Sequence, residues 1–334
     1  MLPLAALVTV FRPQRVWRGG VLALAAALLP GLLWLAATHA TTTLQGAASI
    51  ARASFGSGFW LSLVLLAFLT NSALQQLRAT PLLRTALYGA VLLSVLAMLA
   101  SGVCDNLSLI KEYRQRADDF ASLLARHVLM VVMALAATVC VGVPLGWLAQ
   151  THAKVGRALL PVLNIIQTIP SIALFGLLMA PLSLLAASLP ALARAGISGV
   201  GLAPAVMALT LYGLLPVVRG VLAGLKRVPT SMRSAATALG LTPFQVLRHI
   251  DLPLALPVLL GGLRTAAVAS VGLTAVTALI GAGGLGSILF EGLFSNAQDL
   301  VLLGVFPIVV LGLLVDALFK ALTGLARARA RVGS

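Results

Sequence analysis

Long, unbroken apolar stretches dominate the pattern of hydrophobic and polar positions along the chain. A helix needs about 20 mostly apolar residues to cross the hydrocarbon core of a bilayer. The stretches run continuously instead of alternating, which favours helices over a β-barrel. We therefore expect an all-α polytopic membrane protein with about eight transmembrane helices. The expected spans are 20–38, 59–76, 82–103, 128–149, 158–183, 202–222, 254–281 and 300–323.

Composition supports this fold class. Apolar and aromatic residues make up 60% of the 334 residues, and charged residues only 9%. A soluble domain carries about 25% charged residues, so this chain lacks the charges that a soluble surface of its size needs. The composition excludes a soluble enzyme, a disordered protein, a fibrous repeat and a disulfide scaffold.

The excess of positive charge predicts how the chain is oriented. The net charge is +15, from 23 Lys and Arg residues against 8 Asp and Glu residues. With the N-terminus inside, 16 basic residues fall in inner segments, six fall in outer segments, and Arg264 falls within a span. Cytoplasmic loops are enriched in Lys and Arg. We expect both termini in the cytoplasm, with the basic residues near lipid headgroups and no nucleic-acid partner.

The inner loop at about 223–253 carries strong local signals for two short helices. Gly240 is a good helix terminator. Thr242 can cap the next helix, with Pro243 as its first residue and Gln245 as the third. We expect the helices to bend at Gly240 and the second to stop before Pro253. A solvated connector is the alternative, but the matched caps favour a docking site for a soluble partner.

The same loop resembles the EAA signature of ABC importer permeases. In that family a bent helix pair couples the permease to an ATPase subunit. The family's usual Glu is replaced here by Ser234, so no charged contact of that Glu is carried over. The residues that the resemblance assigns to this coupling loop are Ser234, Ala235, Ala236, Gly240, Leu241, Ile250, Leu252 and Pro253.

The resemblance covers about 125–323, a type I ABC importer permease core of about five helices. Within it, NIIQTIPSIALFG (164–176) and ALIGAGGLG (278–286) look like osmoprotectant permeases, which import glycine betaine, choline and carnitine. SIARASFGSGFW (49–60) and NLSLIKEY (106–113) look like the Yeh-type permease of that branch. We expect about three extra N-terminal helices and an outer loop in 1–124, and a basic cytoplasmic tail in 324–334.

The resemblance also implies partners. They are ABC ATPase subunits, a periplasmic substrate-binding protein and a second permease copy or a related permease, in a bacterial inner membrane. Aromatic residues make up only 5% of the chain. Because quaternary ammonium groups are normally held by several aromatic faces, selection should lie mainly with the external binding protein.

Polar residues inside spans are candidates for the translocation pathway, because each costs free energy in lipid. The polar residues of the fifth span recur at three- and four-residue steps, so they form one stripe along the helix. The prolines of this span should kink the helix. Helix–helix hydrogen bonding is the alternative. Arg264, in the seventh span, is expected either to snorkel to the surface or to act in gating. The pathway candidates are Asn164, Gln167, Thr168, Pro170, Ser171, Thr274 and Thr277.

Residues 281–286 read GAGGLG, a literal GxGxxG sequence that contains Gly281, Gly283, Gly284 and Gly286. A dinucleotide site needs a strand before it and a βαβ unit around it, whereas an apolar helix is expected here. The glycines therefore predict a sharp turn and close packing at the outer mouth of the pathway. The chain has no GxxxxGK[ST] phosphate loop, so ATP hydrolysis is expected in a partner subunit.

No metal, cofactor or catalytic set is expected. The four histidines lie in separate segments without metal-ligand spacing. Asp316 and Lys320 stand four residues apart and should pair near the end of the last span. We therefore expect a transport subunit rather than an enzyme.

Other functions remain open at this point. An ABC permease could serve another small solute, such as an amino acid or a sulfonate. A secondary transporter driven by an ion gradient usually has a buried carboxylate and inverted repeats, and neither is evident in the sequence. A membrane-embedded enzyme or assembly factor would need a cluster of catalytic or metal-binding side chains at one depth.

Overall fold

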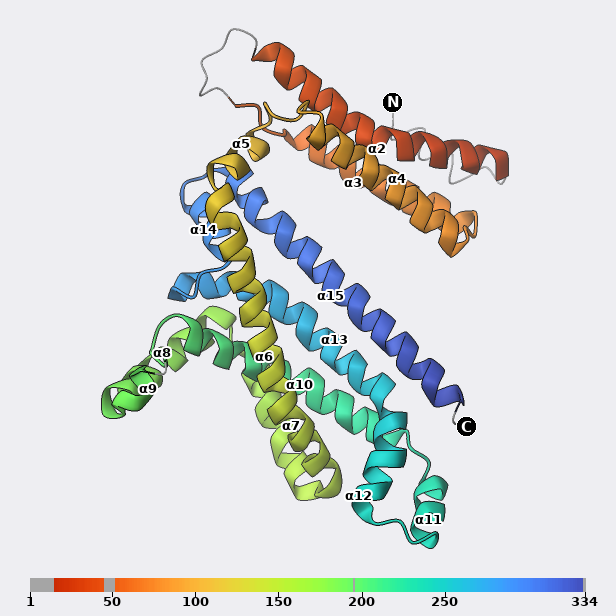
Figure 1. Ribbon diagram of the computed structural model, residues 1–334, viewed down its shortest axis with the longest axis vertical. Helices are drawn as coiled ribbons and strands as arrows, with labels where there is room; N and C mark the ends of the chain where they lie inside the picture. The colour runs from red at the N-terminus through yellow and green to blue at the C-terminus, as the bar shows by residue number, and fades with distance from the viewer. Residues whose placement is uncertain (1–14, 45–51, 195, 333–334) are drawn as a thin grey trace. The chain divides into compact units, whose positions relative to one another are not determined.

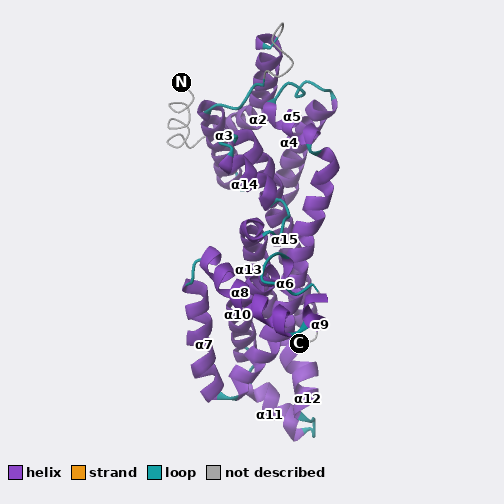
Figure 2. Ribbon diagram, turned by 90° about the vertical axis from the view of Figure 1, so that its left-hand side faces the viewer, coloured by secondary structure: helices purple, strands orange, loops and turns teal. Residues whose placement is uncertain are grey.

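The structure, a computed structural model, describes residues 15–44, 52–194 and 196–332 (Figures 1 and 2). Within the described residues, 8 helices are long and apolar enough to cross a membrane, which confirms the all-α polytopic prediction. Arg12 and the first residues of the 49–60 motif lie outside the described residues. The spans are Gly19–Thr43, Ser57–Gln76, Leu82–Ala100, Ala117–Thr151, Ser171–Ser188, Leu202–Lys226, Pro243–Ile280 and Gln298–Ala328.

The chain divides into two compact units, with the division between Arg116 and Ala117. In the first unit α2 packs against α3 and α4. The backbone N–H of Ser108 donates to the carbonyl of Ala53 at 2.9 Å, and Arg52 forms an ion pair with Glu112. These contacts join the segment before α3 to α5. The helices of this unit are α2 (Arg15–Thr43), α3 (Ser57–Gln76), α4 (Pro81–Ala100) and α5 (Ser108–Gln115).

In the second unit α10 is the central helix. It packs against both α6 and α13, and α13 in turn packs against α15. In the second unit, α11 and α12 lie at one end and α14 at the other (Figures 1 and 2). The helices are α6 (Ala117–Thr151), α7 (Ala153–Thr168), α8 (Ser171–Ser188), α9 (Pro190–Arg194), α10 (Leu202–Lys226), α11 (Thr230–Ala238), α12 (Pro243–Val246), α13 (Leu252–Val276), α14 (Gly286–Phe294) and α15 (Gln298–Val332).

Glycines allow these helices to approach closely. A Cβ at Gly146 of α6 would lie 2.7 Å from the Cβ of Val221 on α10. A Cβ at Gly262 of α13 would lie 2.5 Å from the carbonyl oxygen of Pro216 on α10. Small residues are typical of helix contacts in membranes, where van der Waals packing is a main source of association. The glycines therefore fix α10 between its two neighbours.

The continuous helix expected over 158–183 is wrong. The chain breaks between α7, which ends at Thr168, and α8, which begins at Ser171. Ile169 has extended backbone angles (φ −69°, ψ 127°), as is typical of a residue before proline. Pro170 has no N–H to continue the α7 ladder, so the proline ends the helix where a kink was expected.

The prediction that the helix after Gly240 stops before Pro253 is also wrong. A π-turn over Leu247–Asp251 joins α12 directly to α13. In it the N–H of Leu252 donates to the carbonyl of Leu247, five residues back. A proline ring in a regular α-helix clashes with the carbonyl four residues earlier, and the wider π-turn precedes Pro253. The helix therefore passes the proline without a break.

Residues 324–334 were predicted to be a basic cytoplasmic tail. Within the described residues, α15 continues through this segment as a helix as far as Val332.

Candidate functional site

The bent pair formed by α11 and α12 has the predicted turn at Gly240. The residue has φ +82°, in the left-handed region that glycine adopts most readily. Its N–H donates to the carbonyl of Thr237 at 3.0 Å, and the N–H of Leu241 donates to that of Ala236 at 3.1 Å. This pair of backbone hydrogen bonds is the usual pattern at a helix end terminated by glycine. The predicted bend is therefore confirmed.

The predicted cap of α12 is confirmed as well. The backbone N–H of Thr242 donates to Oε1 of Gln245 at 2.8 Å, and the N–H of Gln245 donates to Oγ1 of Thr242 at 3.4 Å. Pro243 occupies the first turn, where its missing N–H costs nothing. Local hydrogen bonds therefore specify both sides of the bend.

Arg233 connects the bent pair to the transmembrane helices. Its Nε donates to Oδ1 of Asp251 at 2.7 Å, and a terminal guanidinium nitrogen donates to the carbonyl of Leu225 at 3.0 Å. The contacts link α11 to the end of α10 and to the π-turn. Sequence reasoning missed this pair, although opposite charges at the two ends of a helical hairpin were a usable signal.

The bent pair presents large apolar side chains on its outside. Leu239 is 81% exposed and Phe244 is 67% exposed, one on each side of Gly240. These two residues were also missed; the signal was large apolar residues outside every expected span. Of the expected small-residue face, Ala235 and Ala238 are exposed, whereas Ala236 turns inward and is 4% exposed.

The remaining residues assigned to the loop lie on and beside the same pair. Ser234, Leu252 and Pro253 are exposed, and Leu241 and Ile250 are half-buried. The structure thus brings the assigned loop residues together over α11, α12 and the start of α13.

The polar stripe of the broken span makes hydrogen bonds to α10. Oδ1 of Asn164 accepts from Arg219 at 2.7 Å, and Nε2 of Gln167 donates to the carbonyl of Tyr212 at 2.9 Å. Thr168 donates to a carbonyl of its own helix at 2.7 Å. Ser171 lies beyond the break, on α8, so the expected single stripe is divided between two helices.

Tyr212 holds the break itself. Its hydroxyl donates to the carbonyl of Ile169, the residue just before Pro170. Phe175 on α8, 1% exposed, packs in an apolar cluster that includes Tyr212. This tyrosine gives a hydrogen bond to backbone that the helix break would otherwise leave unpaired.

The two threonines assigned to the pathway near the end of the seventh span face inward. Thr274, on α13, and Thr277, which begins the 3₁₀ helix after it, are both 0% exposed. Their hydroxyls donate to the carbonyls of Ser270 and Thr274, each at 2.7 Å. In this conformation both threonines are packed inside the second unit.

The glycine run forms a sharp turn after a short 3₁₀ helix, not after a strand. Gly281, Gly283 and Gly284 have φ between +77° and +81°. Nε of Arg126 on α6 donates to the carbonyl of Ala282 at 2.5 Å. A Cβ at Gly286 would lie 2.0 Å from a backbone oxygen of α13. The predicted turn and close packing are confirmed.

Asp316 joins two helices through a pair of cations. It lies 2.5 Å from Arg264 of α13 and 2.7 Å from Lys320 of its own helix. The pairing with Lys320 was predicted. The pairing with Arg264 was not, and it shows that the arginine within a span has an acidic partner.

Among the residues that the structure describes, no group of three or more His, Cys, Asp or Glu side chains could hold a metal ion.

Comparisons with known proteins place this arrangement in a family. Residues 142–327 match the binding-protein-dependent transport system inner membrane component. The chain belongs to that family. Residues 1–110 match the N-terminal domain of the ABC transporter permease YehY. Family membership and the apolar helices identify the chain as a multi-pass inner-membrane component of a transport system.

Individual relatives agree with this assignment. The chain is 38% identical to the osmoprotectant import permease protein OsmW of Salmonella typhimurium, over 60% of this chain and 89% of the relative. It is 36% identical to the glycine betaine/carnitine/choline transport system permease protein OpuCD of Bacillus subtilis, over 57% of this chain and 77% of the relative. An inward-facing structure of the MetNI methionine ABC transporter shares the fold (TM-score 0.50, 24% identity, covering 60% and 95%).

Proposed function

We propose that the chain is the permease subunit of an ATP-driven importer for osmoprotectants such as glycine betaine and related quaternary ammonium compounds. The observation that carries this proposal is the 38% identity to an osmoprotectant import permease across 89% of that relative. The similarity to a glycine betaine/carnitine/choline permease supports the same substrate class. ATP hydrolysis is assigned to a separate subunit.

In this proposal the ATPase docks on α11 and α12 in the cytoplasm. Leu239 and Phe244 provide apolar side chains that a soluble partner can cover, since they stand outside the candidate spans or at the very start of one. Arg233 holds α11 against α10 and the π-turn. A partner that moves the bent pair therefore also pulls on the transmembrane helices.

The translocation pathway is assigned to α7, α8 and α13, completed by a second permease copy or a related permease. Asn164, Gln167 and the helix break at Pro170 support this, because broken helices with polar side chains are typical of transport sites in membranes. The buried Thr274 and Thr277 would join the pathway in another conformation. The glycine turn marks the outer mouth, where an external binding protein delivers substrate.

Uptake by the reconstituted importer tests this function. The chain is placed in proteoliposomes with its ATPase and binding protein, and ATP-dependent accumulation of labelled glycine betaine and choline is measured. Uptake of an amino acid or sulfonate instead would refute the substrate class. Accumulation that follows an ion gradient and ignores ATP would refute the mechanism.

Docking is tested with a matched pair of phenylalanines. Phe244→Ala removes an exposed ring from the bent pair, and Phe294→Ala removes one that is 76% exposed at the end of α14. A residue at the centre of an interface contributes about 2 kcal/mol, or roughly thirty-fold in affinity. We expect Phe244→Ala alone to weaken ATPase binding by about that factor. Equal binding by both variants would refute the docking surface.

A further inference from the structure

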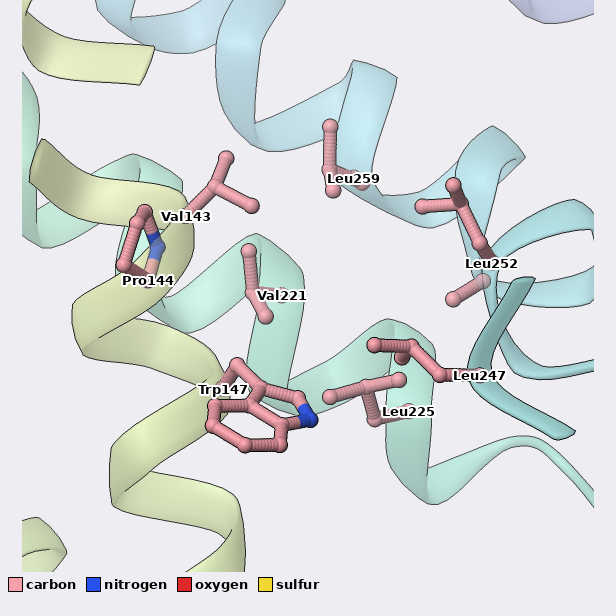
Figure 3. A pocket seen from close by; sticks show the side chains of 9 residues that line it. Val143, Pro144, Trp147, Val221, Leu225, Leu247, Leu252 and Leu259 are labelled. Carbon is pink, nitrogen blue, oxygen red and sulfur yellow. The ribbon is translucent and has the colours of Figure 1, made fainter. Parts of the chain in front are cut away.

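An apolar cavity of about 340 Å³ lies where α6, α10 and α13 converge (Figure 3). Cavities that hold small ligands have volumes of about 300–1,000 Å³. Trp147 of α6 faces Leu225 of α10, Val143 lines the cavity farther along α6, and Leu247 and Leu252 line the side next to the π-turn. The cavity is thus large enough for an apolar group and lies outside the proposed pathway residues.

The cavity has a closed floor and an open side. Ala255 is 2% exposed and Leu259 is 7% exposed. Trp147 and Leu252 are each 44% exposed. In a membrane protein an open apolar hollow between helices is filled by lipid unless another protein covers it.

Basic residues follow directly after two residues of the cavity wall. Lys226 and Arg227 follow Leu225, Arg248 follows Leu247, and all three are exposed. Asp251, the acidic residue nearest in sequence to this cluster, is paired with Arg233. Basic pockets between transmembrane helices recognise anionic lipid headgroups. The apolar cavity suits the acyl chain of such a lipid, and the exposed basic residues that follow its wall residues in the chain suit the headgroup.

We propose that this cavity binds one acyl chain of an anionic phospholipid, whose headgroup phosphate lies against Arg227 and Arg248. This lipid site goes beyond the transport function and does not depend on the identity of the substrate. Because Leu247 begins the π-turn, the bound lipid contacts the segment that joins α12 to α13.

Trp147 supplies a direct reporter. The other three tryptophans, Trp17, Trp34 and Trp60, are replaced by phenylalanine, and the full chain is placed in phosphatidylcholine nanodiscs. Lipids brominated on the acyl chain quench tryptophan fluorescence on contact. We expect brominated phosphatidylglycerol to quench Trp147 at a several-fold lower mole fraction than brominated phosphatidylcholine, with the preference falling as salt screens the headgroup.

Two pairs of variants separate the acyl-chain site from the headgroup site. Val143→Phe fills the cavity from α6, and Val141→Phe, on an exposed position of the same helix, is its control. We expect only Val143→Phe to remove the preferential quenching. Each variant is checked for an unchanged size-exclusion profile and melting temperature, so that a folding defect is recognised.

The headgroup site is tested with two double variants. The first combines Arg227→Gln with Arg248→Gln, and its control combines Lys154→Gln with Arg157→Gln, both on exposed positions of α7. Each basic residue near an anionic surface contributes roughly a five-fold preference. The first double variant should therefore lose at least about five-fold of the selectivity, and the second should keep it. Equal quenching by the two lipids, quenching unaffected by Val143→Phe, or protection of Trp147 from both lipids by a second copy would each overturn the proposal.

Discussion

The ion pair between Arg233 and Asp251 gives the sharpest test of how the bent pair is held. The side chains of Arg233 and Asp251 are 31% and 14% exposed, so the pair is more buried than a surface ion pair and less buried than one in a protein interior. Exposed pairs contribute about 0–1 kcal/mol, and breaking a fully buried pair costs about 3–5 kcal/mol. Arg233 also keeps a hydrogen bond to the carbonyl of Leu225. We expect Asp251→Asn to loosen α11 by about 2 kcal/mol, the value of one charge-assisted hydrogen bond.

Hydrogen exchange measures this directly, because local opening of α11 exposes its amides. A loss of about 2 kcal/mol raises exchange roughly thirty-fold in that helix. Arg233→Gln also loses the hydrogen bond to Leu225 and should raise exchange further. Adding Asp251→Asn to Arg233→Gln should change little, since a double-mutant cycle isolates the pairwise energy. Lys154→Gln, an exposed change on α7, is the control.

The reasoning is refuted if the free-energy changes of the two single variants add independently in the double variant. It is also refuted if exchange in α11 rises no more than in the control. In the full importer, the same loosening should leave ATP hydrolysis running while uptake per ATP falls. Unchanged uptake in a variant with fast exchange would show that the ion pair between Arg233 and Asp251 stabilises the fold but does not couple ATP hydrolysis to uptake.

Three further changes test packing and capping. Gly262→Ala places a methyl 2.5 Å from a carbonyl oxygen of α10 and should cost about 1–3 kcal/mol in thermal unfolding, whereas Gly261→Ala meets nothing within 4 Å and should not destabilise. Thr242→Ala should cost α12 about 1 kcal/mol, seen as faster amide exchange in its first turn. Asp316→Asn leaves Arg264 without its charged partner and should lower the stability of the protein by up to about 3 kcal/mol. Asp316→Leu combined with Arg264→Met removes both charges and should restore most of the melting temperature.

The features that the sequence predicted well depend on neighbouring residues. The turn at Gly240 and the cap formed by Thr242 and Gln245 involve groups within a few positions, so their hydrogen bonds can be inferred from spacing alone. The spans follow from the length of the apolar runs. Each of these features is local, and the chain needs no tertiary contact to specify it.

The features that were missed depend on contacts between distant parts of the chain. Arg264 and Asp316 are 52 positions apart, and their pairing follows only from the packing of α13 against α15. The break at Pro170 was expected as a kink, because proline permits both outcomes. Tyr212, which satisfies the exposed carbonyl, is 43 positions away from it.

The missed π-turn changes how movement would travel through the permease. A helix that stopped before Pro253 would leave a flexible joint between the bent pair and the membrane. Instead one helical segment runs from Pro243 to Ile280 and ends at the glycine turn, where Arg126 of α6 binds the carbonyl of Ala282. Because a helix transmits displacement along its axis and a loop absorbs it, the proposed docking at α12 and the packing at the glycine turn would act on the same helical element. In the proposed importer, movement of the ATPase would therefore reach the glycine turn along α13, while Arg233 would carry part of it to α10.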